Sequence, residues 1–137
     1  MEAIVRADGR QLRLSEGQEF EVSRLAGEHD ATLIVDDAHG LGVLGATGAG
    51  TAEHLGVRDR VHVLTGSLGK AIGGTAGGFV AGPAAVIELL MQAARPQLFS
   101  TALPVASISA AHEALRQIAA HPDMVAEISR KARLFRD

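Results

Sequence analysis

The chain has 137 residues, which fits one domain or a piece of one, and 47% of them are hydrophobic, which is ordinary for a soluble protein. It contains no cysteine, which excludes disulfides and thiolate zinc sites, and its net charge of −3 offers no basic surface to nucleic acid. Tryptophan and tyrosine are absent while Ala and Gly dominate, so we expect closely apposed backbones, as in a helix-covered parallel sheet.

The first third of the chain predicts a helix and a strand after an uncertain start. Residues 2–5 and 11–14 fit two short strands around a turn, or a loosely ordered terminus, which is the interpretation we prefer. Apolar residues at helical spacing predict a helix over residues 19–30. The short β-branched run at residues 32–35 predicts a buried parallel strand.

Glycine-rich segments then alternate with further strands. The density of glycines indicates a long loop over residues 36–50, followed by a short helix over 51–55. Residues 61–64 and 77–82 predict two more buried strands, with a Gly/Ser/Thr-rich loop between them. That loop contains one ionisable residue, Lys70.

The last third predicts helices that begin at prolines. Pro83 and Pro104 each open an amphipathic helix, with a short extended segment at residues 98–102 between the two helices. His121 and Pro122 break the pattern before a last helix over residues 124–135. Because strands alternate with helices, the predicted class is α/β, with a mainly parallel sheet flanked by helices.

A membrane span is not expected from this pattern. Residues 71–87 carry no charge, but glycines and Pro83 interrupt them, and a spanning helix needs about 20 mostly apolar residues. No signal-peptide pattern opens the sequence, so a cytoplasmic location is our expectation.

The polar residues that could do chemistry follow the predicted strands. Asp36 and His39 follow the first strand, and Ser67 and Lys70 follow the second. Ligands of open α/β sheets bind beyond the carboxyl ends of the strands. These four residues are therefore the candidate site.

Two kinds of site fit poorly. A Walker A loop needs Ser or Thr after its lysine and a glycine five positions before its second glycine, but Ala71 and Leu64 occupy those positions. A metal site built from Asp36, Asp37 and His39, with His54 or His62, has suitable ligand types, although such pairs recur by chance in loops.

Pyridoxal phosphate (PLP) fits better than either. Lys70 can hold the aldehyde as a Schiff base, and a carboxylate must keep the pyridine nitrogen protonated. Asp36, at the end of a buried strand, is the candidate for that carboxylate, and pairing with a ring cation would offset the cost of its burial. Ser67 is a candidate phosphate donor. A turn or capping role is the alternative for Asp36.

Several strings together resemble the α-oxoamine synthases, which are fold-type I PLP enzymes that condense an amino acid with an acyl-CoA. The strings are residues 35–45, 48–50, 65–70, 73–74, 77–78 and 95–101. The resemblance runs from about Val22 to the C-terminus. It implies residues 21–137 as part of a PLP-binding large domain of the aspartate aminotransferase type, and leaves residues 1–20 as a poorly matched segment.

The resemblance also implies a role for each candidate residue. Lys70 is similar to the lysine that binds the cofactor and moves protons on the substrate α-carbon, and Asp36 to the pyridinium partner. His39 is similar to a ligand of the ring's phenolic oxygen, and Ser67 stands where the family usually has a phosphate-binding threonine. Ser100 and Thr101 resemble a segment that reaches the phosphate of the neighbouring subunit, which implies a homodimer with shared active sites.

Three functions follow from the resemblance. Residues 64–79 and 95–100 are most similar to the members that join glycine to acetyl-CoA. Members of biotin synthesis, which join alanine to a pimeloyl thioester, fit as the alternative. The family's chains are longer, and its ring-stacking residue and substrate-binding arginine have no counterpart here, so we also expect impaired activity. A non-catalytic remnant that binds PLP weakly, or binds only a partner, is the third reading.

Overall fold

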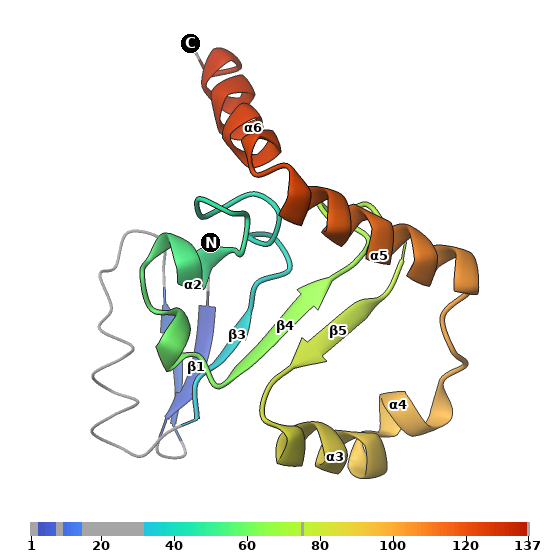
Figure 1. Ribbon diagram of the computed structural model, residues 1–137. Helices are drawn as coiled ribbons and strands as arrows, with labels where there is room; N and C mark the ends of the chain where they lie inside the picture. Colours follow the sequence, from blue (N-terminus) through green and yellow to red (C-terminus); the bar gives the residue numbers. More distant parts are fainter. Residues whose placement is uncertain (1–2, 8–9, 15–31, 75, 137) are drawn as a thin grey trace. The chain divides into compact units, whose positions relative to one another are not determined.

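The structure is a computed structural model that describes residues 3–7, 10–14, 32–74 and 76–136 (Figure 1). The chain divides into two compact units, residues 1–33 and 34–137. In the first unit, β1 (Ala3–Ala7) pairs antiparallel with β2 (Arg10–Leu14), so the preferred interpretation of a loosely ordered terminus is wrong for these segments. The predicted helix over residues 19–30 lies outside the described residues.

The second unit contains a sheet of three described strands in the order β3-β4-β5 (Figure 1). β3 (Ile34–Asp36) pairs parallel with β4 (Val63–Ser67), and the register places Asp36 opposite Thr65. β5 (Gly78–Ala81) runs antiparallel to β4, with Ser67 opposite Gly78. Among its described residues, the short loop between β4 and β5 contains no crossover helix, which a parallel return would require.

The helices follow the predicted order. They are α2 (Thr51–His54), a 3-10 turn at Arg58–Arg60, α3 (Ala84–Ala93), α4 (Arg95–Phe99), α5 (Val105–Ala120) and α6 (Asp123–Leu134). A proline occupies the N-cap of α3, α5 and α6. The predicted extended segment at residues 98–102 is partly wrong, because α4 continues to Phe99 and the backbone becomes extended only at Ser100. Pro96, in the first turn of α4, has the backbone angle that a helix start needs.

The centre of the second unit is formed by small residues where α5 meets the loop after β4. Ala111 of α5 is 3% exposed, and a Cβ on Gly74 of that loop would lie 2.6 Å from the Cβ of Ala111. A Cβ on Gly48 would lie 2.9 Å from Val125 of α6. Backbone and helix therefore touch directly, as the Ala- and Gly-rich composition predicts.

Large apolar side chains lie mostly outside this centre. Two of the three strands predicted to be buried are open: Ile34 of β3 is 61% exposed and Val80 of β5 is 44% exposed, whereas Val63 of β4 is 4% exposed. Phe99, Val105 and Ile108 are exposed at and after α4. The prediction of burial was wrong for β3 and β5, because no described element covers their apolar side chains, and it holds for Val63 of β4.

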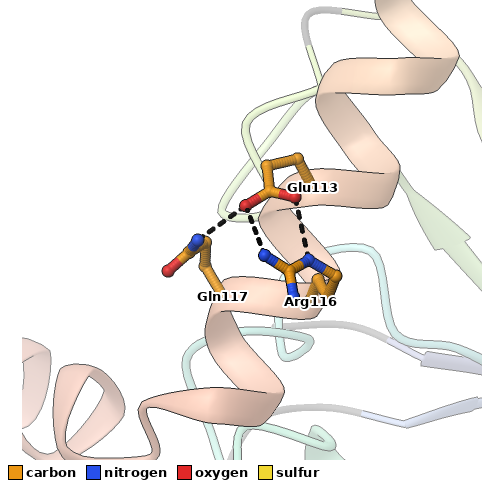
Figure 2. A network of polar contacts seen from close by, with 3 residues as sticks. All are labelled: Glu113, Arg116 and Gln117. Atoms are coloured by element: carbon orange, nitrogen blue, oxygen red, sulfur yellow. Dashed lines mark hydrogen bonds and ion pairs between the residues drawn. The ribbon is translucent and has the colours of Figure 1, made fainter.

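The exposed surface of α5 includes a polar cluster as well as the apolar side chains of Val105 and Ile108. Glu113 accepts hydrogen bonds from Nε of Arg116 at 3.0 Å and from Nε2 of Gln117 at 2.6 Å (Figure 2). The hydrogen bond from Arg116, followed by that from Gln117, lowers the pKa of Glu113 to about 2. Such exposed pairs contribute little to stability. They lie on an exposed part of α5. None of the described helices has the length and hydrophobicity that crossing a bilayer would require.

Candidate functional site

Lys70 projects from a tightly turned loop after β4. Backbone hydrogen bonds close the loop, from Leu68 N to Gly77 O at 2.9 Å, from Gly74 N to Leu68 O at 2.6 Å, and from Gly73 N to Lys70 O at 2.9 Å. Ile72 of this loop is 4% exposed, while Lys70 itself is exposed. The loop therefore presents the lysine amine at the carboxyl end of β4.

His39 meets this amine from the loop after β3. Nε2 of His39 lies 3.1 Å from Nζ of Lys70, a hydrogen-bonding distance in which either nitrogen can donate, depending on the imidazole tautomer. The two residues come from neighbouring parallel strands whose carboxyl ends share one edge of the sheet. The structure thus brings together two of the residues predicted from the sequence.

Asp36 lies at the same edge but differs from the expectation in its exposure. It is the last residue of β3, its side chain is exposed, and its Oδ1 accepts a hydrogen bond from Ala38 N at 3.2 Å. The expected burial is therefore wrong, because no described element covers that face of β3. The contact with Ala38 is that of a turn aspartate, and it leaves the other carboxylate oxygen, Oδ2, outside this bond.

The buried carboxylate at this point is Asp37, whose structural role was not foreseen from the sequence. Asp37 is 3% exposed, and its oxygens accept hydrogen bonds from N and Oγ1 of Thr51, each at 2.6 Å. Successive residues of a strand point to opposite faces, so an Asp-Asp pair at a strand end was a usable signal. Among the described residues, no group of three or more His, Cys, Asp or Glu could hold a metal ion.

Glu53 holds the glycine-rich loop of residues 36–50 at its Thr47 and Ala49, and this role was not predicted from the sequence. Its carboxylate accepts hydrogen bonds from Thr47 Oγ1 and Ala49 N, each at 2.9 Å, and from Thr47 N at 3.2 Å. Desolvation raises the pKa of Glu53, but these hydrogen bonds outweigh it, and the pKa is lowered overall. The loop between β3 and α2 is thus built around two carboxylates.

The remaining predicted residues are Ser67, Ser100 and Thr101. Oγ of Ser67, the last residue of β4, accepts a hydrogen bond from Gly69 N at 3.3 Å. Ser100 and Thr101 are exposed in the extended segment after α4. In the part of the chain that the structure describes, no hydrogen bond joins either of them to Asp36, His39 or Lys70.

Comparison with known proteins places the chain in a family of enzymes. Residues 14–137 match the family described as Aminotransferase class I and II. The mitochondrial 2-amino-3-ketobutyrate coenzyme A ligase of Bos taurus is 45% identical over 116 residues, which are 85% of this chain and 28% of that protein. The 8-amino-7-oxononanoate synthase of Thioalkalivibrio sulfidiphilus is 52% identical over 101 residues, which are 73% of this chain and 26% of that protein.

Solved structures show the same fold. A structure of SPT with the PLP internal aldimine superimposes with a TM-score of 0.76 at 29% identity, over 82% of this chain and 28% of that one. The 8-amino-7-oxononanoate synthase of Francisella tularensis gives a TM-score of 0.64 at 34% identity, over 80% of this chain and 33% of that one. These matches confirm the expected fold class, a partial domain of the PLP-dependent transferase fold. The chain spans about a third or less of the relatives that it matches.

Proposed function

The chain belongs to the aminotransferase class I and II family, and we propose that it forms the PLP-binding part of an acyltransferase that joins an amino acid to an acyl-CoA. The observation that supports this most strongly is the 3.1 Å contact between Lys70 and His39, at the sheet edge where Asp36 ends β3. PLP uses an amine for its aldehyde and a carboxylate for its pyridine nitrogen. The resemblance to the α-oxoamine synthases assigns the imidazole of His39 to the phenolic oxygen.

The residues present fit the cofactor. Lys70 is exposed, so its amine can reach an aldehyde, and Asp36 has an oxygen outside its bond to Ala38 that can keep a pyridine nitrogen protonated. His39 orients the lysine and can donate to the phenolic oxygen, and the hydroxyl of Ser67 can donate to the phosphate. PLP, when bound, supplies an electron sink for charge on the amino acid α-carbon. Lys70 would then move a proton at that carbon.

We propose glycine and acetyl-CoA as the substrates, on the likeness of residues 64–79 to the enzymes that use them. The relative named 2-amino-3-ketobutyrate coenzyme A ligase supports this choice. A second candidate pair is alanine and a pimeloyl thioester, which the relatives named 8-amino-7-oxononanoate synthase support. The two candidates are separated by the amino acid, glycine or alanine, whose addition changes the absorbance of the PLP-loaded chain.

Further proposals concern the assembly and the location. We propose a homodimer in which Ser100 and Thr101 reach the phosphate of the neighbouring subunit, supported by their exposure at the end of α4. We also propose residues 21–137 as the cofactor-binding part and residues 1–20 as a segment outside it. The cytoplasmic location stays a prediction, since one relative is named as mitochondrial.

The cofactor proposal is tested by titrating the purified chain with PLP and following its absorbance. We expect saturable binding with a changed PLP spectrum, lost in Lys70→Ala and retained in Lys131→Ala. Lys131 is the matched control, because it is the other lysine of the chain and lies in α6. Equal loss in both variants, or spectra that match free PLP throughout, would contradict the proposal.

The alternative of a non-catalytic PLP-binding remnant is favoured by the open apolar surface around the strands. Release of CoA from acetyl-CoA and glycine decides between the two. We expect no turnover from the 137-residue chain alone, because residues that would stack on the ring and bind the substrate carboxylate have no counterpart in it. Steady release of CoA that disappears in Lys70→Ala would show that this part of the account is wrong.

A further inference from the structure

The Asp37 carboxylate is held in a closed backbone cradle. Its two oxygens accept hydrogen bonds from N and Oγ1 of Thr51, and a carboxylate that is 3% exposed requires such partners to offset its desolvation. Any Cβ on Gly40 or Gly50 would overlap this carboxylate. Gly50 also has a φ of 92°, which favours glycine. The two ends of the glycine-rich loop therefore meet at Asp37.

The backbone of Asp37 connects this cradle to the sheet and to His39. Its N–H donates to Thr65 O of β4 at 2.9 Å, which extends the parallel ladder by one bond beyond Asp36. Its carbonyl accepts from Gly40 N and Leu41 N, each at 3.1 Å, and so closes the turn that contains His39. The position of His39 thus depends on one residue that is bonded both to β4 and to α2.

Lys70 is connected to β4 as well, because its loop directly follows this strand in the chain. β4 ends at Ser67, and the closed loop after it presents Lys70. Asp37 therefore relates the turn of His39 to the strand that precedes Lys70. A change at Asp37 would release the turn from α2 while leaving both bases in the chain.

We propose that Asp37 is a positioning residue that sets the separation of His39 and Lys70. It acts through the turn of residues 37–40, with Thr51 as its partner. The inference rests on the proposed function for its consequence in cofactor binding. The geometry that supports the positioning role is that of the cofactor-free chain. The positioning role and the proposed cofactor binding can therefore be tested separately.

The test measures reductive methylation of Lys70 by ¹³C-formaldehyde in the cofactor-free chain, with Lys131 of the same molecule as internal reference. The ratio of the two rates reports the surroundings of the Lys70 amine. His39→Gln defines the full effect of losing the imidazole contact. A hydrogen bond involving a charged group is worth about 1.5 kcal/mol, so the change in the ratio should approach about tenfold.

We expect Asp37→Asn to shift the ratio in the same direction as His39→Gln, and Thr51→Val to give a smaller shift. Thr51→Ser keeps the hydroxyl and should keep the wild-type ratio. Asp59→Asn, at an exposed aspartate, is the matched control and should leave it unchanged. Where Asp37→Asn does not fold, as judged by circular dichroism, the two Thr51 variants decide.

If Asp37 had only a structural role, Asp37→Asn would lower the stability of the chain. It would not change the ratio of the Lys70 and Lys131 methylation rates in the molecules that remain folded. Wild-type ratios in folded Asp37→Asn and Thr51→Val, beside a changed ratio in His39→Gln, would overturn the proposal. An unchanged ratio in His39→Gln would overturn it as well. If the ratio shifts as expected but PLP does not react with Lys70, the proposed function fails while the positioning role stands.

Discussion

Nζ of Lys70 lies 3.1 Å from Nε2 of His39, although 31 positions separate the two residues in the sequence. The parallel pairing of β3 with β4 accounts for this meeting, because it brings the carboxyl ends of both strands to one edge. Asp36 ends β3 at that edge, opposite Thr65. Two bases and a carboxylate therefore lie at the end of a small sheet, and the proposed function depends on their combination.

The charge of Asp36 should affect the affinity for PLP but not the stability of the fold. Asp36→Asn keeps an oxygen for the bond from Ala38 N, and the side chain is exposed, so we expect a change in stability within about 0.5 kcal/mol. Loss of a charged partner for the ring nitrogen should weaken PLP binding about 10- to 100-fold. Absorbance titration measures the affinity. Asp59→Asn is the control, and equal PLP affinities for the two variants would contradict the assignment.

The imidazole of His39 should contribute less than the carboxylate of Asp36. His39→Gln removes one hydrogen-bonding partner of Lys70 and of the proposed phenolic oxygen, and one such bond contributes about 1 kcal/mol. We therefore expect the Kd for PLP to rise about fivefold to tenfold relative to the wild type. His112→Gln, on the exposed face of α5, should have no effect. A His39→Gln variant that binds PLP as the wild type does would argue against the contact.

The sequence predicted the class of the fold because its signals were local. Short apolar runs bounded by polar residues or glycines predicted the strands, and prolines predicted the starts of α3 and α5. Burial could not be predicted in the same way, since it depends on which other elements cover a strand. Ile34 fits a buried strand by its type, yet it is 61% exposed.

The candidate site was predicted in part for the same reason. Lys70, Asp36 and His39 are recognisable from their places after strands, and the sheet brings their segments together. The roles of Asp37 and Glu53 depend on how a glycine-rich loop folds back on itself, which local propensity does not specify. Only the structure shows that Asp37 binds Thr51, 14 positions later in the chain.

The contact between Gly74 and Ala111 should be sensitive to one methyl group. In Gly74→Ala the new Cβ would lie 2.6 Å from the Cβ of Ala111 and 3.0 Å from Leu68 O, so the lysine loop and α5 must separate. We expect a loss of about 1–3 kcal/mol in the free energy of unfolding, measured by urea denaturation. Ala111→Gly in the same chain should recover part of the loss. Additive effects of the two substitutions would show that they do not touch.

The glycine-rich loop should loosen in acid through Glu53. Its hydrogen bonds lower the pKa of Glu53 below the ordinary value of 4.5, so folding favours the ionised form. The stabilisation is therefore present above about pH 4.5 and is lost as the pH falls through the folded-state pKa. We expect Glu53→Gln to be less stable than the wild type at pH 7 and to approach it in acid, measured by denaturation at several pH values.

A matched control is available on α3. Glu88→Gln changes an exposed glutamate and should track the wild type across the same pH range. A difference between Glu53→Gln and wild type that stays constant from pH 7 to acid would show that the charge of Glu53 does not stabilise the loop.

The most direct test of the central claim is the site at which PLP becomes attached. The chain is incubated with PLP, reduced with borohydride and digested, and mass spectrometry locates the modified residue. The account predicts a phosphopyridoxyl group on Lys70, absent from Lys70→Ala and reduced in Asp36→Asn, with Lys131 unmodified at low PLP. A label that lies mainly on Lys131 or the terminal amine, or that persists undiminished in Lys70→Ala, would contradict it.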